Sequence, residues 1–303
     1  TIVTLFNYQH NRDQLIKTHI EYFETITDLK KNRIVDFINN QKKSVLEIQN
    51  DFNIRKNLPI LINFKNNRDN IAYIKAKNNL DSQLRPFQKI NGLFDVMLID
   101  TEGKIIYASN SVHSEKELGD LLPDPGNKSF KEGKKGVYIT KIFSNPMESN
   151  NFAMLASGPI YNTLASGPLY DKDNELIGVV VLEIDLRPLY TLIKDRTGLG
   201  KTGETLIARQ SNDGGALFLC PLRYDKNAAL EKTILPGDNL AYPILNAVNK
   251  KQGKGISIDY RGEKVVSVWR YLPEVDWGLV TKIDTNELFS SVTTLGRFNL
   301  LIS

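Results

Sequence analysis

The sequence predicts an α+β protein in which a long N-terminal helix supports two related antiparallel β-sheet modules in series. The main observation is a phrase that closes both halves of the chain: IDLRPLY at 184–190 returns as IDTNELF at 283–289. In each copy a glycine and a run of β-branched residues come first, which is typical of a buried strand. The strand ends at an aspartate, a residue that commonly caps a helix. The shared order of strand, cap and helix indicates two modules of one kind.

Both aspartates lie where a helix is expected to begin. Asp284 and Glu287 match a capping box, in which the two side chains bind backbone N–H groups of the first turn. Asp185 can cap in the same way, because Pro188 is tolerated in a first turn. We therefore expect one helix at residues 186–196 and another from residue 285 onwards.

Length and composition fit two globular modules. The 303 residues are 41% hydrophobic and 24% charged, so two domains of ordinary size can each bury a core. The net charge of +4 is small and the basic residues are interspersed with acidic ones, which disfavours a nucleic-acid interface. The single cysteine, Cys220, excludes an internal disulfide framework and a multi-cysteine metal site.

The first 91 residues contain no glycine and have the spacing of an amphipathic helix. Apolar residues recur every three or four positions, at Ile16, Ile20, Phe23, Ile34, Ile38, Val45, Ile48 and Phe52. The pattern predicts a helix to about residue 56, which would be roughly 80 Å long. Because one globular core cannot cover that length, the helix should lie against two modules, a partner helix, or both, and part of its apolar stripe should stay uncovered in a monomer. We therefore predict weak parallel homodimerisation through residues 16–38.

Both ends of the chain are apolar but short. Residues 1–6 and 298–303 fall far below the roughly 20 apolar residues that a membrane helix needs. They are either apolar helix ends or the stubs of membrane helices, as expected if the chain, which begins at Thr1, is an excised piece. We expect no signal peptide within these residues.

Alternating and β-branched runs place the strands of the first module at 94–100, 104–109, 137–143, 152–161 and 177–184. We expect them to form a five-stranded antiparallel meander. Within it, LASGPIY at 155–161 is repeated as LASGPLY at 164–170, which suggests a local duplication that lengthens one strand connection. The second module should have strands at 204–210, 216–220, 255–261, 263–272 and 277–283, with a helix near 240–249.

These features together resemble the double Cache sensor domain, the extracytoplasmic input region of prokaryotic histidine kinases and chemoreceptors. The resemblance is carried by the order of three phrases behind the long helix, namely GVVVLEID at 178–185, GLGKTGE at 198–204 and DWGLVTKID at 276–284. It implies two tandem PAS-like modules. The expected boundaries are a helical region at 1–91, a membrane-distal module at 92–185, a membrane-proximal module at 186–284, and a helix at 285–303 leading to a membrane span.

The sequence contains no complete motif for catalysis or nucleotide binding. Gly198, Gly200 and Gly203 match a dinucleotide fingerprint, but a helix precedes them and a strand follows, which is the reverse of what that motif needs. A phosphate loop would need glycine where Asp195 stands. The three histidines have no ligand spacing, and neither a hydrolase elbow nor a zinc-protease motif occurs. We expect a non-catalytic segment without a cofactor or a metal.

Glu183 is the most informative single residue, because it lies inside an apolar strand where an uncompensated carboxylate would be costly. Alternation places Glu183 on one face with Val179 and Val181. The residue is either solvated or paired with a lysine at the strand end, or it faces a ligand. The resemblance favours a carboxylate that faces a ligand, because amino-acid-binding members of the family carry an aspartate near this place that meets the ligand amine. Asp185 is assigned mainly to helix capping.

The rest of the amino-acid motif of that family is incomplete in this chain. Asn127, Ser129, Phe130 and Phe143 stand where an arginine, a tryptophan-tyrosine pair and a tyrosine would be expected. Lys128 can supply only a point charge in place of the arginine fork. The expected pocket combines aromatic side chains with two charges, from Phe130, Phe143, Tyr107, Tyr138, Lys141 and Glu183, and suits a small polar or zwitterionic ligand.

The sequence thus predicts an extracytoplasmic ligand-binding sensor domain of a transmembrane receptor, most often a histidine kinase. Alternatives are the input domain of a chemoreceptor or diguanylate cyclase, a spacer or partner-binding module without a ligand, and an extracytoplasmic enzyme, which the missing motifs disfavour. The second module carries Lys282 where the first carries Glu183, so we predict that it binds nothing essential.

Overall fold

The computed structural model describes residues 2–111, 117–144, 161–162, 164–171 and 173–289. The chain forms two compact units. We call Phe37–Arg187 the first module, and Thr1–Asp36 with Pro188–Ser303 the second module. The residues of the expected helical region at 1–91 are divided between these two units.

Three helices open the chain: α1 (Ile2–Gln49), α2 (Phe52–Asn63) and α3 (Ile71–Ile90). The prediction that the first helix continues to about residue 56 is wrong. Asp51 starts a new helix there, since its carboxylate accepts hydrogen bonds from the backbone N–H groups of Asn53 at 2.7 Å and Ile54 at 3.2 Å. In the described residues, no helix is both long and apolar enough to cross a membrane.

The sheet of the first module is antiparallel, with the strand order β2-β1-β7-β6-β3. These strands are β1 (Leu93–Ile99), β2 (Ile105–Ala108), β3 (Tyr138–Ile139), β6 (Leu164–Tyr170) and β7 (Leu176–Ile184). The predicted meander is wrong in its order, because the last strand pairs with the first: Met97 lies opposite Val181. This pairing puts the two most apolar strands side by side in the centre of the sheet, where both of their faces are covered.

The second copy of the repeated segment, LASGPLY at 164–170, is a strand of this sheet, since it forms β6 in full. Of the strand predicted at 152–161, residues 152–160 lie outside the described residues. Residue 161 belongs to a short ladder, in which β4 (Phe143–Ser144) pairs with β5 (Tyr161–Asn162).

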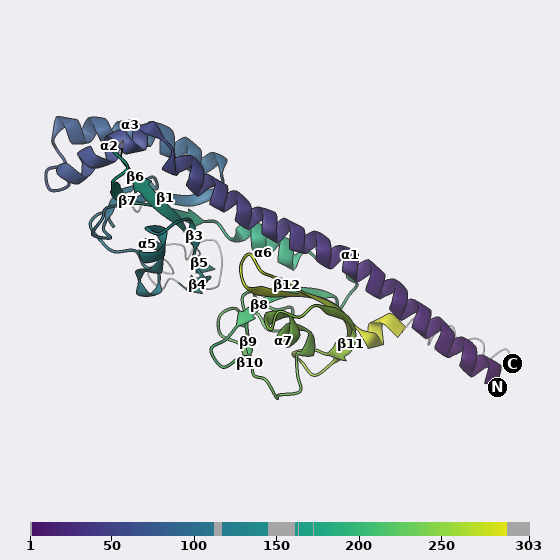
Figure 1. Ribbon diagram of the computed structural model, residues 1–303. Helices are drawn as coiled ribbons and strands as arrows, with labels where there is room; N and C mark the ends of the chain where they lie inside the picture. The colour runs from purple at the N-terminus through teal and green to yellow at the C-terminus, as the bar shows by residue number, and fades with distance from the viewer. Residues whose placement is uncertain (1, 112–116, 145–160, 163, 172, 290–303) are drawn as a thin grey trace. The chain divides into compact units, whose positions relative to one another are not determined.

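Helices cover the two faces of this sheet unequally (Figure 1). The end of α1 together with α2 and α3 lies on one face, where the Cβ positions of Gly167 and Gly178 approach Val45 and Leu58. The opposite face carries η1 (Pro125–Asn127) and the short helix α5 (Lys128–Gly133). We call this second side the α5 face.

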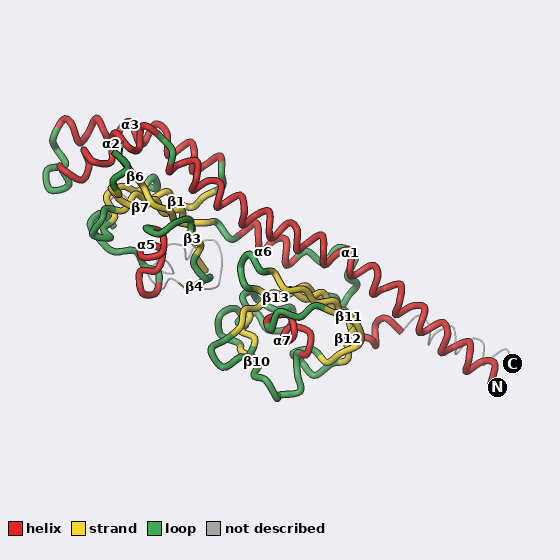
Figure 2. The backbone as a smooth tube through the Cα atoms, in the orientation of Figure 1, coloured by secondary structure: helices red, strands yellow, loops and turns green. Residues whose placement is uncertain are grey.

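The second module has a six-stranded antiparallel sheet with the order β10-β9-β8-β13-β12-β11. Its strands are β8 (Glu204–Gln210), β9 (Ala216–Phe218), β10 (Thr233–Ile234), β11 (Gly253–Ile258), β12 (Lys264–Leu272) and β13 (Trp277–Asp284). The helix α6 (Arg187–Lys194) leads into the module, and α7 (Tyr242–Val248) covers the face of the sheet opposite to α1 (Figure 2). Residues 285–289 are helical.

The apolar stripe of α1 is buried within the second module. Phe23 is fully buried and packs with Val266, Val268 and Ile283 of the sheet, and Ile16 and Ile20 are partly buried against the same cluster. The expectation that part of the stripe at residues 16–38 stays uncovered is therefore wrong for Phe23, Ile34 and Ile38, which are buried, whereas Ile16 and Ile20 remain partly exposed.

The single cysteine lies just after β9 and is buried, with 1% of its surface exposed. Its sulfur is 4.0 Å from the carbonyl oxygen of Ile207 in β8. Burial raises the pKa of the Cys220 thiol to about 12. The thiol is therefore protonated and unreactive in the folded module.

Candidate functional site

Glu183 lies on the α5 face of the first sheet. It stands opposite Leu164 of β6, and it alternates with Val179 and Val181, which share a hydrophobic cluster with Phe130 and Phe143. Glu183 is 4% exposed. The structure thus brings together a buried carboxylate and the two phenylalanines that the sequence predicted for one pocket.

Asp95 is a second buried carboxylate on this face, and sequence reasoning missed it. Its backbone is paired with that of Glu183, so the two side chains leave neighbouring strands on the same side. The Asp95 carboxylate accepts hydrogen bonds from the Ser109 hydroxyl at 2.7 Å and the Asn110 N–H at 2.8 Å. Its position in the apolar run FDVMLI at 94–99 was the available signal.

Helix α5 is held against the sheet by a chain of polar contacts. The Asp124 carboxylate accepts hydrogen bonds from the backbone N–H of Ser129 at 2.9 Å and from its hydroxyl. The Ser166 hydroxyl of β6 donates to the carbonyl oxygen of Ser129 at 2.8 Å. Gly133 allows the close approach, because a Cβ there would lie 2.9 Å from Val179. These contacts fix the position of Phe130 over the strands.

Tyr138 also lies on the α5 face, since it stands opposite Ser166 in the ladder between β3 and β6. Its side chain is half-buried. Burial raises the pKa of its hydroxyl, and the nearby charges of Glu132 and Asp124 raise it further. The two lysines predicted for the pocket, Lys128 and Lys141, are both exposed to solvent.

Two predicted pocket residues lie elsewhere. Tyr107 points to the helices on the other face, where its hydroxyl donates a hydrogen bond to Asp81 of α3 at 3.0 Å. Asp185 follows the end of β7, and its carboxylate accepts from the backbone N–H of Arg187 at 2.9 Å and pairs with the guanidinium of the same residue. Asp185 thus has the capping role assigned to it, and Tyr107 does not belong to the α5 face.

In the second module, Lys282 occupies the corresponding place on the last strand, β13. It lies on the α7 side of the sheet, because Ile283 beside it packs towards α1. Lys282 is 1% exposed, and its ammonium group lies 2.7 Å from Asp259 and 3.3 Å from Glu204. Burial alone would raise the pKa of Asp259, but the charge and hydrogen bond of Lys282 and the two hydrogen bonds from Arg261 bring it below its ordinary value.

The sequence profile of the Cache domain family matches residues 11–292, nearly the whole chain. The chain belongs to the Cache domain family. Its fold is similar to that of the sensory domain of the Campylobacter jejuni chemoreceptor Tlp3, at 15% identity and a TM-score of 0.59, with 91% of this chain and 98% of that one covered.

Two further solved structures are similar in fold. The sensor domain of the Vibrio cholerae histidine kinase DctB has 14% identity and a TM-score of 0.58, with 88% of this chain and 98% of that one covered. The ligand-binding domain of Mlp24 with asparagine has 15% identity and a TM-score of 0.52, with 94% and 99% covered. No curated protein sequence matches this chain.

The glycine motif of this Cache domain binds a carboxylate of the chain itself. The backbone N–H groups of Lys201 and Thr202 donate to the two oxygens of Glu287, both at 2.6 Å, and the Thr202 hydroxyl donates to the same carboxylate. Gly200 has φ +73°, and a Cβ there would lie 2.6 Å from Glu287. The loop is therefore no dinucleotide site.

The predicted capping box at Asp284 and Glu287 is wrong as a result. The backbone N–H of Asp284 donates to the Thr202 hydroxyl at 3.1 Å, and the Asp284 carboxylate binds Arg261. The Glu287 carboxylate accepts hydrogen bonds from the loop before β8, so the helix at 285–289 is attached to that loop and does not form the predicted capping box.

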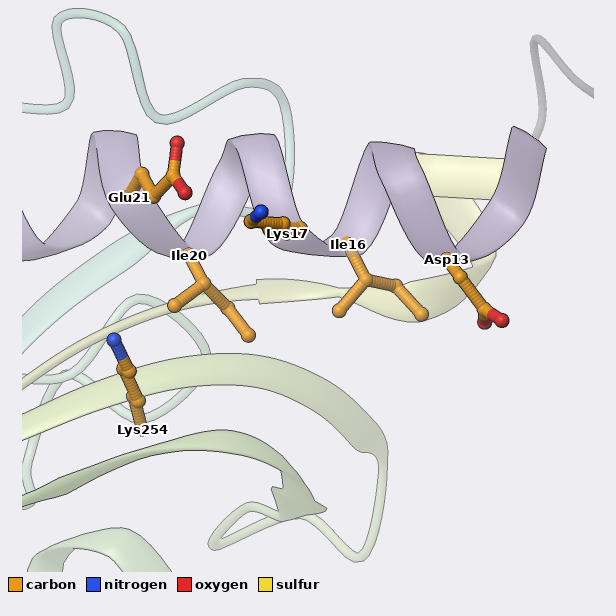
Figure 3. Close-up of a pocket in the computed structure, with 6 residues that line it drawn as sticks. All are labelled: Asp13, Ile16, Lys17, Ile20, Glu21 and Lys254. Carbon is orange, nitrogen blue, oxygen red and sulfur yellow. The ribbon is translucent and has the colours of Figure 1, made fainter. Parts of the chain in front are cut away.

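A groove of about 280 Å³ lies between α1 and β11 of the second module. Figure 3 shows Ile16 and Ile20 pointing from α1 towards the strands, and Lys254 pointing back towards the helix. Lys254 forms an ion pair with Glu24 at 2.8 Å. The groove has an apolar floor and charges of both signs at its rim, and it lies on the side of the sheet opposite to Lys282.

Proposed function

We propose that this chain is the extracytoplasmic ligand-binding part of a transmembrane receptor, and that its first module binds a small polar or zwitterionic molecule on the α5 face. The observation that carries the proposal is the buried carboxylate of Glu183 on the α5 face, which also carries Phe130 and Phe143, at the end of the strand that leads into α6. Membership of the Cache family and the fold similarity to chemoreceptor and histidine kinase sensor domains support the receptor role.

The similar structures indicate the size of the ligand. Tlp3 domains are described in complex with L-norvaline, L-valine and isoleucine, and the Mlp24 domain with asparagine. In this chain the acidic side chains Glu183 and Asp95 favour a ligand ammonium group. The arginine expected for a ligand carboxylate is missing, so we propose a ligand that relies on its ammonium and apolar parts more than on a carboxylate.

We propose that the parent protein is a sensor histidine kinase. A chemoreceptor or a diguanylate cyclase is the alternative, because the same fold serves chemoreceptors. Signalling would be a population shift, in which the ligand binds one conformation of the first sheet better and so changes the packing at the end of β7. A useful coupling free energy is about 1–3 kcal/mol.

A thermal-shift screen of small metabolites tests the proposal, followed by titration calorimetry on two matched variants. Tyr138→Phe changes the α5 face and should weaken binding of the hit by about three- to tenfold, as expected for one lost hydrogen bond. Tyr107→Phe changes the other face of the same sheet, so it should lower stability and leave affinity unchanged. The reverse pattern, or ligand density in the second sheet alone, would contradict the proposal.

A further inference from the structure

The second module holds a buried ammonium group in a cage of opposite charge. Lys282 approaches Asp259 at 2.7 Å and Glu204 at 3.3 Å, and none of the three side chains is more than 4% exposed. Buried charges persist only when they are paired and hydrogen-bonded. Here two carboxylates face one ammonium from two different segments of the chain.

Aromatic rings complete the cage. The Lys282 nitrogen lies 5.0 Å from the ring centre of Tyr260 and 6.0 Å from that of Tyr224, within the range of a cation–π contact. The Tyr260 hydroxyl also donates to Glu204 at 3.0 Å. Carboxylates and aromatic faces around one point are the groups with which proteins recognise ammonium ligands.

The walls of the cage are fixed by contacts that do not involve Lys282. Glu204 accepts hydrogen bonds from the backbone N–H of Arg223 and from Tyr260. Asp259 accepts from the backbone N–H of Arg261 at 2.8 Å and from its guanidinium, which also binds Asp284. The two acceptors are therefore held in place by the fold rather than by the lysine.

We infer that the second module contains a site for a primary alkylammonium, and that the chain fills this site with its own Lys282. The lysine lies on the strand position at which the first module carries Glu183, so a tethered ammonium stands where a free ligand could otherwise enter. The native module is thus permanently occupied and does not respond to free amines. This inference does not depend on what the first module binds.

Removing the lysine side chain should open the site to a free amine. Lys282→Ala keeps the β carbon, so the atoms removed correspond to n-propylammonium. We expect n-propylammonium chloride to raise the midpoint of thermal unfolding of Lys282→Ala by roughly 3–6 °C at about tenfold its Kd, relative to sodium chloride of equal ionic strength. Neutral 1-propanol should not do so.

Two controls separate site binding from a general solvent effect. Lys282→Met fills the apolar part of the space, and the native protein fills all of it, so neither should gain stability from the amine. Equal midpoints for Lys282→Ala in propylammonium and sodium chloride, or an equal gain in Lys282→Met, would overturn the inference. If Lys282→Ala does not accumulate in folded form, it can be refolded from urea in n-propylammonium chloride or in sodium chloride. The inference requires recovery of folded protein in the propylammonium salt alone, and equal recovery in both salts would overturn it.

Discussion

The last strands of the two sheets, β7 and β13, carry opposite charges at the same place. Each has an ionisable residue directly before an Ile-Asp pair, and each side chain lies on the face away from the early helices. Glu183 lies on the α5 face, which also carries the cluster of Phe130 and Phe143. Lys282 is enclosed by Asp259 and Glu204 of its own module. The same strand position therefore carries a buried acid in one copy and, in the other, a buried base paired with two carboxylates.

The difference follows from the neighbouring strands. In the first module, β1 places a second carboxylate, Asp95, next to Glu183, so the face gathers negative charge. In the second, β8 places Glu204 opposite Lys282, and the turn after β11 brings Asp259 to it. The two final strands thus differ in the sign of one buried charge, and the neighbouring segments add acidic side chains next to it in both modules.

The largest effect is expected from removing the internal cation. Lys282→Met leaves Glu204 and Asp259 buried without their ammonium partner, and should lower the free energy of unfolding by about 3–5 kcal/mol at pH 7. Urea unfolding followed by circular dichroism measures it. Lys264→Met, at an exposed position of the neighbouring β12, is the matched control and should be nearly neutral. A loss below about 1 kcal/mol would mean that the two modules do not differ as described.

Lys30 offers a contrast within the second module. It is 5% exposed, and its ammonium donates to the carbonyl oxygen of Asp195 at 2.6 Å and the hydroxyl of Thr205 at 3.0 Å. Burial lowers the pKa of Lys30 to about 8; the charge of Asp195 opposes this shift and that of Arg33 adds to it.

The stability of the protein should therefore depend on pH through Lys30. The unfolded chain keeps the proton up to about pH 10.4, while the folded state loses it near pH 8, so the free energy of unfolding should rise between these values, by up to about 3 kcal/mol. Lys30→Met should remove this rise. The difference between the unfolding curves of native protein and variant from pH 7 to pH 10 measures it, and identical slopes would contradict the assignment.

Glu287 tests the tie between the glycine loop and the helix at 285–289. Burial alone would raise the pKa of Glu287, but hydrogen bonds from Thr202 and Lys201 lower it, so its stabilisation is present at neutral pH and lost on acidification below about pH 4. Glu287→Gln should cost about 1–2 kcal/mol and speed amide exchange at 285–289 about tenfold. Hydrogen exchange with mass spectrometry reports it, with the exposed Glu263→Gln as control. Unchanged exchange would show that the loop does not hold the helix.

Glu183→Gln decides which cation compensates the first module. With a ligand ammonium as partner, the variant should keep the stability of the ligand-free protein and lose about 1–3 kcal/mol of binding free energy. With a cation of the chain as partner, stability should fall and affinity should persist. Thermal unfolding and titration calorimetry on the same preparation give both values, and the second outcome would remove Glu183 from the ligand site.

The smallest expected effect concerns assembly. Because Phe23 is buried in the second module, a dimer through residues 16–38 would have to use the outer side of α1, where Tyr22 is 46% and Leu29 is 51% exposed. Leu29→Glu should then lower the sedimentation coefficient at high concentration without changing stability. Phe23→Glu is unsuitable as a test because it would disrupt the core. A monomer at all concentrations would contradict helix-mediated dimerisation.

Features that depend on local sequence were predictable. The strand β8 has the bounds expected from its apolar run, and α7 lies within the expected range, because propensity and flanking turns define both. The break of the long helix was missed because Asp51 is a cap in an otherwise helical pattern. The sheet order was missed because the pairing of β1 with β7 joins segments far apart in the chain, which periodicity cannot reveal.

Strand alternation predicted that Glu183 shares a face with Val179 and Val181, and these three residues do lie on one face of β7. Tyr107 lies on the other face, because it stands opposite Leu98, and a β-bulge shifts the register of β1 and β2 between Leu98 and Ile99. One extra residue in a strand turns the following side chains to the other face. In the second module the charge of Lys282 was visible in the sequence, whereas its partners, Glu204 and Asp259, follow from strand register alone.

The buried Cys220 allows local opening of the second module to be measured by thiol labelling. A thiol reagent attacks an exposed thiolate, so the folded protein should stay unlabelled, and each adduct records a transient opening around β8 and β9. The first module has no cysteine and is silent in such a measurement. The labelling rate of Cys220, measured by mass spectrometry with and without a ligand, would therefore show whether a ligand bound to the first module changes local opening of the second. The measurement needs no engineered label.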